Sequence, residues 1–298
     1  MKMTILNKGS IEKGVIIFAF LLIPVTLLLV FGYYPAIKLV QLSLSDWNGY
    51  SQTISYVGFD NYVAVLTNEE YYSAFFHNLA YIVSCFLMVA LSLYVAIILN
   101  TSLRGRNFYR TILFLPYVVN GVAVALMFNF LFDFNDSPIN VFLRWLGFDG
   151  IRFISPNYSV NFSLSLVVVW RHFGFFMVLF LAGLQSIPQD LYDSAKIDGA
   201  GFGTVIHHII IPSIRRIIEI CLFLAIATSM QVFYEPFLIT RGGPAGASHT
   251  FVSKIIDVAF HFSNFGKASA MGVVLLLLMI LIIGVQRYII SKGAQYHE

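Results

Sequence analysis

The chain has 298 residues, of which 58% are apolar and only 11% are Asp, Glu, Lys or Arg, with a formal net charge of +3. Soluble domains carry about 25% charged residues, so this composition excludes a soluble enzyme and a disordered chain. The small positive charge also excludes the basic footprint of a nucleic-acid binder, and a single polytopic membrane domain covering residues 1–298 is predicted.

Six apolar stretches predict membrane-spanning helices. Crossing the hydrocarbon core takes roughly 20 apolar residues in an α-helix, and these stretches are apolar on every face, which argues against β-strands. In chain order, the predicted spans cover approximately residues 15–34, 79–99, 112–132, 162–184, 217–239 and 268–290. The predicted fold class is therefore an all-α membrane protein with six transmembrane helices.

The distribution of basic residues predicts the orientation of these helices. Cytoplasmic loops of membrane proteins carry an excess of Lys and Arg. The bias is strongest between the second and third spans, where Arg104, Arg106 and Arg110 have no acidic residue beside them in the sequence. Both termini are therefore expected in the cytoplasm, with long external loops at 35–78 and 133–161.

The cytoplasmic loop at 187–213 between the fourth and fifth spans has a helix–turn–helix pattern. Pro188 stops the preceding helix, and Gly199 ends a short helix over 189–198. We expect Leu191, Ala195 and Ile197 to be buried against the spans, which leaves Asp193 and Asp198 free to meet a partner. A solvated connector without a partner is the alternative.

The same loop carries the residues of a known motif. Asp193-Ser194-Ala195, then Asp198-Gly199-Ala200, and then Ile206 and Pro212 resemble the EAA motif of membrane subunits in bacterial binding-protein-dependent ABC importers. Further matching segments are Phe114-Leu115-Pro116-Tyr117, Thr240-x-Gly242-Gly243-Pro244 and Phe265-Gly266-Lys267-Ala268. Together they resemble the first of two permeases in the carbohydrate-uptake branch, of the maltose, lactose and glycerol-3-phosphate type.

That resemblance implies a type I ABC importer permease fold in the bacterial cytoplasmic membrane. Its partners would be a second homologous permease, two ATP-binding subunits, an extracytoplasmic solute-binding protein and a carbohydrate. The chain lacks a G-x-x-x-x-G-K-[ST] phosphate loop. It is therefore expected to be no enzyme and to hold no cofactor, with ATP and Mg bound by the partner ATPase.

The coupling residues implied by the motif are those that would dock on the ATPase: Asp193, Ser194, Ala195, Asp198, Gly199, Ala200, Ile206 and Pro212. In this interpretation Asp193 pairs with a basic residue of the ATPase. Gly199 allows a tight backbone turn, and the small Ala195 and Ala200 allow close docking.

Polar residues inside the predicted spans indicate a substrate pathway. A charge at the centre of a membrane costs roughly 3 kcal/mol, which makes Arg171 a candidate for binding substrate and Glu235 its candidate partner; Gln231 and Asn120 are intramembrane amides. The resemblance adds positions that would line the midplane: Tyr117, Gly121, Trp170, Phe173, Gly174, Ser229 and Val232. Helix packing is the alternative role for each of these residues.

Two other function classes stay open at this stage. A gradient-driven secondary carrier acting without an ATPase would also lack a phosphate loop, although it is expected to show inverted repeats. An intramembrane enzyme would need a nucleophile or metal cluster, for which Arg171 and Glu235 are poor candidates. Arg215 and Glu219, four residues apart, predict a local ion pair.

Overall fold

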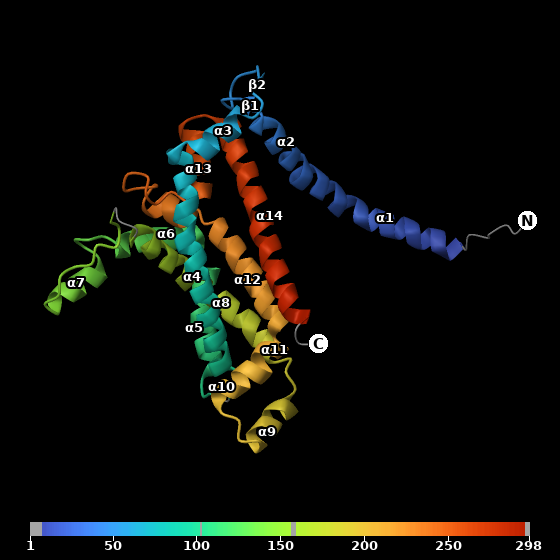
Figure 1. Cartoon of the computed structure of the whole chain (residues 1–298), viewed down its shortest axis with the longest axis vertical. Coiled ribbons are helices and arrows are strands. Elements are labelled where there is room, and N and C mark those ends of the chain that lie inside the picture. Colours follow the sequence, from blue (N-terminus) through green and yellow to red (C-terminus); the bar gives the residue numbers. More distant parts are fainter. Residues whose placement is uncertain (1–7, 102, 156–158, 296–298) are drawn as a thin grey trace, which may run out of the picture. The chain divides into compact units, whose positions relative to one another are not determined.

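The computed structural model describes residues 8–101, 103–155 and 159–295. Nearly all regular structure is helical, as the composition predicts (Figure 1). Within the described residues, five helical segments are long and apolar enough to cross a membrane: Lys13–Ser43, Glu69–Leu99, Val160–Leu184, Arg215–Ile239 and Phe265–Tyr288. The helices divide into two compact units, which are described separately below.

The first unit comprises the described residues up to Val65 together with Val258–Val274. It begins with a continuous helical segment made of α1 (Lys8–Leu28), the π-helical turn η1 (Leu29–Tyr33) and α2 (Tyr34–Ser43). This segment is long and apolar enough to cross a membrane. Lipid or protein must cover its side chains, because such an apolar surface cannot face water.

A small antiparallel pair of strands follows in the same unit. In it, β1 (Ser45–Asp46) pairs with β2 (Ser55–Tyr56), with Ser45 opposite Tyr56. The side-chain amide of Asn61, in α3 (Asp60–Thr67), donates to the carbonyl oxygens of Ser43 at 3.0 Å and Ser45 at 2.8 Å. These bonds satisfy buried carbonyl groups at the end of α2.

The second unit comprises Leu66–Asp257 and the residues from Leu275 onward. Its helices are α4 (Glu69–Leu99), α5 (Arg106–Val118), α6 (Gly121–Leu131), α7 (Pro138–Trp145), α8 (Ser159–Leu184), α9 (Gln189–Ile197), α10 (Phe202–Val205), η2 (Ile206–Ile210), α11 (Ile211–Ser213), α12 (Arg215–Met230), η3 (Glu235–Ile239) and α13 (Phe251–Ile256). Two further elements, η4 (Asp257–His261) and α14 (Phe265–Gln295), are shared between the units.

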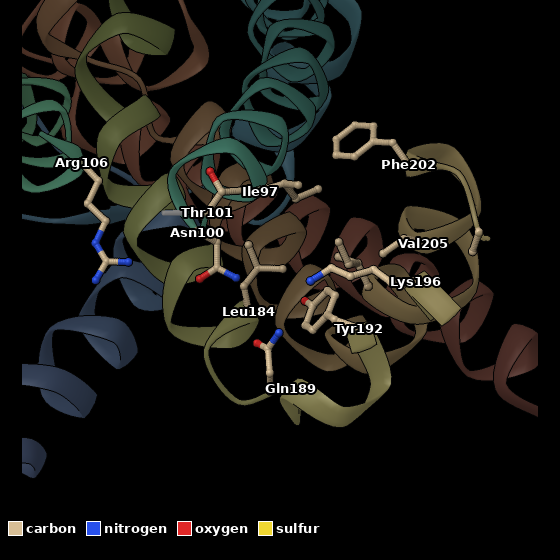
Figure 2. A pocket seen from close by; sticks show the side chains of 12 residues that line it. Ile97, Asn100, Thr101, Arg106, Leu184, Gln189, Tyr192, Lys196, Phe202 and Val205 are labelled. Carbon is tan, nitrogen blue, oxygen red and sulfur yellow. The ribbon is translucent and has the colours of Figure 1, made fainter. Parts of the chain in front are cut away.

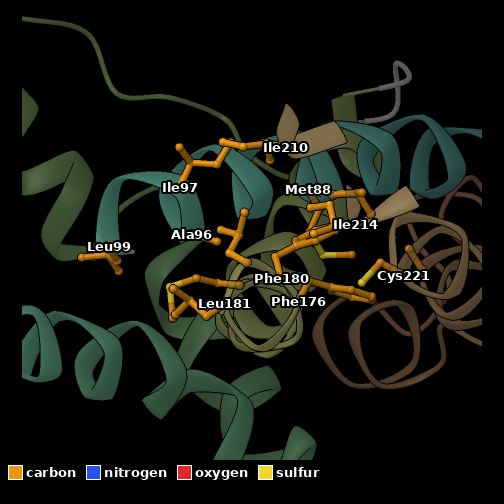
Figure 3. Close-up of a cluster of buried hydrophobic side chains, with 14 of the residues drawn as sticks. Met88, Ala96, Ile97, Leu99, Phe176, Phe180, Leu181, Ile210, Ile214 and Cys221 are labelled. Carbon is orange, nitrogen blue, oxygen red and sulfur yellow. The ribbon is translucent and has the colours of Figure 1, made fainter. Parts of the chain in front are cut away.

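Three helices form the centre of the second unit. α4 packs along α8 and α12, and α5 packs on α8. Figure 3 shows Met88 and Ala96 of α4 gathered with Phe176 and Phe180 of α8, and all four are buried. α9 and α10 lie at one end of this bundle and α13 at the other (Figure 1).

Hydrogen bonds between helices join the same three elements. The hydroxyl groups of Ser84 and Ser165 lie 2.7 Å apart, and Ser92 donates to the carbonyl oxygen of Phe173. The Asn78 amide donates to the carbonyl oxygen of Ser229. Small residues and polar contacts of this kind hold membrane helices together. Apolar side chains alone do not, because contact with lipid buries them as well as contact with another helix does.

The predicted range 112–132 falls on two helices rather than one. α5 and α6 meet at an angle of 96°, so they form a single broken span or a re-entrant loop. Asn120 lies at the break, and its side chain accepts a hydrogen bond from the backbone N–H of Val122 at 2.8 Å. This cap supplies a partner to a backbone group that the break would otherwise leave free.

α8 approaches α5 closely at Gly174. A Cβ atom on this residue would overlap the carbonyl oxygen of Leu113 and lie 2.7 Å from the Cα atom of Phe114. Gly174 therefore sits in backbone-to-backbone contact with α5, an approach that only a residue without a side chain permits.

We expect the substitution Gly174→Ala to destabilise the folded chain by about 1–3 kcal/mol, the usual cost of overpacking. Thermal unfolding of the purified chain in detergent measures the effect. Gly284→Ala is the matched control, because a Cβ atom on this α14 residue meets nothing within 4 Å. Equal unfolding temperatures for the two variants would contradict the close contact.

Candidate functional site

The loop at 187–213 folds as two short helical segments separated by a tight turn. α9 begins after Pro188, carries Asp190 in its first turn and Lys196 in its last, and so matches the helix dipole at both ends. Gly199 follows in the left-handed conformation, with φ at +71°. The N–H of Ala200 donates to the carbonyl oxygen of Ala195 at 2.9 Å and that of Gly199 to Lys196 at 3.1 Å.

These two bonds form the pattern of a Schellman cap, which satisfies the last carbonyl groups of α9 and gives the turn a defined geometry. A Cβ atom on Gly199 would meet nothing within 4 Å, so the residue is required by its backbone conformation and not by crowding within the chain. α10, η2 and α11 then lead through Ile206 to Pro212 without a break.

Burial within the loop differs from the sequence expectation. Ala195 is buried as expected, but Ile197 is 86% exposed and Leu191 is 45% exposed, so the prediction that both pack against the spans is wrong. Ile210 and Ile214 anchor the loop in the apolar core instead. Exposed isoleucine and leucine side chains leave α9 with apolar surface available to another protein.

Two ion pairs lie at this end of the bundle. Lys196 Nζ lies 3.4 Å from Asp193 Oδ1, and both side chains are exposed, so the pair adds little stability. The predicted pair between Arg215 and Glu219 is confirmed, with Nε and Oε1 3.3 Å apart. Asp198 and Ser194 are exposed along with Asp193.

A small cavity lies beside the bend between α5 and α6. Its volume is about 190 Å³, and it brings together the predicted residues Arg171, Gln231, Val232 and Glu235. The Arg171 guanidinium lies over the ring of Tyr234, 5.5 Å from its centroid, an arrangement that favours the positive charge. Arg171 Nε is buried without a hydrogen-bond partner among the described residues.

Gly121 completes the packing around this arginine. A Cβ atom on Gly121 would lie 2.8 Å from Tyr234 Cδ2 and 2.9 Å from Arg171 Nη1. The first residue of α6 therefore leaves the space in which the Arg171 and Tyr234 side chains meet. Asn120, one residue earlier, is exposed and caps the helix.

The remaining predicted pathway residues take part in packing. Trp170 contacts Phe128 edge-to-face at 5.2 Å, and Tyr117 stacks on Phe175 at 4.6 Å. The Phe173 carbonyl accepts a bond from Ser92, and Gly174 lies against α5. Ser229 is buried, and its hydroxyl donates to the carbonyl oxygens of Tyr81 and Ala225.

Sequence reasoning missed five residues that line the cavity. These are Val168, His172, Thr228, Phe233 and Tyr234. Tyr234 and Phe233 stand between Gln231 and Glu235 in the chain, so their position between two intramembrane polar residues was an available signal. Their orientation toward Arg171 depends on the break at Met230–Glu235, which composition does not reveal.

A second polar cluster lies at the end of the bundle opposite α9. The Lys254 side chain is only 6% exposed, and its ammonium lies 2.8 Å from Glu70 and 3.3 Å from Asp257. His249 Nε2 is 3.9 Å from the same Asp257 carboxylate, and His77 contacts the His249 carbonyl oxygen. Burial, then the positive charge of Lys254, lowers the pKa of His249.

We call Glu70, His77, His249, Lys254 and Asp257 the Lys254 cluster. It borders an open cavity of about 480 Å³ that also includes Glu69, Ser73 and the loop residues 245–247. In the described residues, no group of three or more His, Cys, Asp or Glu side chains is arranged to hold a metal ion. The ion pair between Lys254 and Glu70 ties α13 to the start of α4.

Comparison with known proteins places these features in context. Residues 88–293 match the model of the family described as "Binding-protein-dependent transport system inner membrane component". The chain is 32% identical to the diacetylchitobiose uptake system permease protein of Streptomyces coelicolor, over 90% of this chain and 80% of that protein. It is 30% identical to the trehalose/maltose transport system permease protein of Thermococcus litoralis, over 86% of each chain.

The fold has solved neighbours as well. A chain in the crystal structure of a bacterial alginate ABC transporter, in complex with an alginate pentasaccharide-bound periplasmic protein, superposes with a TM-score of 0.81. The match covers 94% of this chain and 95% of that one at 23% sequence identity. This likeness shows that the two chains share a fold.

His249 in the Lys254 cluster predicts that the thermal stability of the chain depends on pH. The pKa of His249 is lower in the folded chain than in the unfolded chain. As the pH decreases, the unfolded chain therefore takes up the proton first, and this uptake favours unfolding. The contribution of His249 to stability is present above the unfolded pKa and is lost as the pH falls through the folded pKa. We expect thermal unfolding in detergent to shift to lower temperature between about pH 7.5 and about pH 5.5, and the shift to shrink in His249→Asn. The control is His207→Asn, an exposed histidine on η2. Equal shifts in both variants would refute this role of His249.

Proposed function

The chain belongs to the family of inner membrane components of binding-protein-dependent transport systems, and on that basis we propose that it is the permease subunit of an ATP-driven importer for a sugar or oligosaccharide. It contributes half of the passage, and a second homologous permease contributes the other half. The observation that carries the proposal is the α9–Gly199 turn, a rigidly capped helix that presents charged and apolar side chains outward.

The coupling step uses the exposed face of α9. The apolar side chains of Ile197 and Leu191 and the carboxylates of Asp193 and Asp198 form a mixed surface that suits a cleft on an ATP-binding subunit. Ser194 and Ala200 are small residues that let the partner approach. Ala195 is buried and Ile206 packs against the apolar core, while the exposed Pro212 follows them in the loop. ATP and Mg bind to the partner, and this chain carries out no hydrolysis.

Movement follows from the stiffness of the loop. When two ATP-binding subunits close, a docked α9 moves with them, and its anchors Ile210 and Ile214 transmit the motion to the core formed by α4, α8 and α12. The passage then alternates between inward-facing and outward-facing packings of rigid helices. An extracytoplasmic solute-binding protein delivers the substrate at the end that carries α13.

The substrate passes the cavity near the bend between α5 and α6. Arg171, Gln231 and Glu235 supply donors and acceptors there, and Tyr234 supplies an aromatic face, a combination that suits hydroxyl-rich ligands. Relatives named for diacetylchitobiose and for trehalose/maltose support a carbohydrate substrate. No comparison supports the alternative of a gradient-driven carrier acting alone.

A panel of solute-binding proteins tests the substrate class. The purified complex, reconstituted with its ATP-binding subunits, is assayed for ATPase stimulation by binding proteins loaded with different sugars. Stimulation by an oligosaccharide-loaded protein supports the proposal, whereas stimulation only by amino-acid-loaded or metal-loaded proteins would overturn the sugar assignment.

The turn at Gly199 generates a direct test of coupling. We expect Gly199→Asp to weaken association with the ATP-binding subunit by at least about tenfold and to abolish uptake. Position 199 has a positive φ that favours glycine, and aspartate adds a charged side chain at the docking surface. Gly246→Asp is the matched control, since Gly246 has φ at +79° with nothing within 4 Å and lies at the other end of the bundle. Co-purification and uptake are measured for both, and normal uptake by Gly199→Asp would exclude the coupling role.

The cavity generates a second test. Arg171→Gln should reduce uptake by about tenfold while the complex still assembles, because one charged donor bordering the cavity is lost. Trp170→Ala, in the same turn of α8, should impair uptake less, since Trp170 packs on Phe128. Wild-type uptake by Arg171→Gln in an assembled complex would assign Arg171 to packing.

A further inference from the structure

A cavity of about 570 Å³ lies beside the α9 loop, and Ala200 is the one residue of the predicted coupling and substrate-pathway sets in its lining. Figure 2 shows Gln189, Tyr192 and Lys196 on one side of this space and Asn100, Thr101 and Arg106 on the other. Apolar side chains of Ile97, Leu184, Val205 and Ile210 provide most of the remaining wall.

Its position corresponds to the ends of two membrane helices. Ile97 lies in the last turn of the span Glu69–Leu99, and Leu184 is the final residue of the span Val160–Leu184. Lipid headgroups lie at the level where apolar spans end and polar loops begin. The cavity therefore has apolar walls toward the membrane core and polar residues toward the loop.

The charged residues of the lining are all basic. Arg106 and Lys196 line the cavity, and no Asp or Glu does so in the described part of the chain. Lys196 also lies 3.4 Å from the Asp193 carboxylate, an exposed pair outside the lining. Arg104, Arg106 and Arg110 make no ion pair with any described residue. Arg106 is also the first residue of α5, a helix without an acidic residue in its first turn, so the dipole adds to the positive potential.

One polar group in the lining lacks a partner. The Tyr192 hydroxyl is buried and makes no hydrogen bond with a described residue, although Tyr192 belongs to the lining. A buried hydroxyl without a partner in the wall of an amphipathic cavity favours a ligand that forms hydrogen bonds.

We propose that this cavity binds the phosphate headgroup of an anionic phospholipid, with Arg106 and Lys196 as its charge partners and with the apolar wall against the glycerol and the first part of the acyl chains. Basic pockets at the ends of membrane helices bind such headgroups. The lipid bridges the α4–α5 junction to α9, so the lipid composition of the membrane acts on the position of the coupling loop. A free phosphate ion matches the charges but leaves the apolar wall uncovered.

Native mass spectrometry of the purified full chain tests the site. The probes are dioleoylphosphatidylglycerol, dioleoylphosphatidylcholine and inorganic phosphate, added separately and in competition. We expect the wild-type chain to retain phosphatidylglycerol in preference to phosphatidylcholine. The double variant Arg106→Gln/Lys196→Gln should bind phosphatidylglycerol roughly tenfold more weakly, and inorganic phosphate should not displace the lipid.

Two further variants make the test specific. Arg216→Gln/Arg287→Gln removes the same charge from exposed positions outside the cavity and should leave lipid retention unchanged. Thr101→Trp places bulk at the exposed rim without changing charge and should reduce retention. The measurement needs neither sugar nor nucleotide, so its outcome is independent of the import assays.

Three results would overturn the proposal. These are equal retention of phosphatidylglycerol by the wild-type chain and Arg106→Gln/Lys196→Gln, equal retention of phosphatidylcholine and phosphatidylglycerol by the wild-type chain, and displacement of the lipid by inorganic phosphate. The third would assign the cavity to a free anion.

Discussion

Every backbone group inside a membrane must find its hydrogen-bond partner within the protein, because hydrocarbon supplies none. This requirement explains why the chain is almost entirely helical. It also explains why α4 and α8 meet through polar residues such as Ser84, Ser165 and Ser92, and why α8 meets α5 in backbone contact at Gly174. Since lipid is as apolar as a leucine side chain, close approach and interhelical hydrogen bonds must hold the bundle together.

The same constraint limits where the helices can break. The bend of 96° between α5 and α6 exposes backbone groups in the middle of a span, and the Asn120 cap together with the nearby polar cavity accommodates them. Arg171 is stable there because it lies over the Tyr234 ring and beside Glu235 and Gln231 rather than in lipid. A break in the helix and an intramembrane charge therefore occur together, which is the arrangement expected of a passage for a polar solute.

The two ends of the bundle differ in chemistry. At one end, the buried Lys254 ammonium pairs with the carboxylates of Glu70 and Asp257 and locks the start of α4 to α13. At the other, α9 is held by a backbone cap and by apolar anchors, while its charged groups remain exposed. A rigid element with an exposed mixed surface suits a partner that pushes on it, and basic residues beside an adjoining cavity place the same loop in contact with the lipid phase.

Composition and hydropathy were sufficient to predict an all-helical membrane protein, because the apolar length needed to cross a bilayer is a local property of the sequence. The turn at Gly199 and the Arg215–Glu219 pair were predictable for the same reason, since they depend on residues a few positions apart. Tertiary structure alone decided that α5 and α6 meet at 96°, that Gly174 lies against α5, and that Ile197 faces outward. It also brought Lys254 to Glu70 and Tyr234 to Arg171, contacts between residues far apart in the chain, which depend on helix packing and leave no local pattern in the sequence.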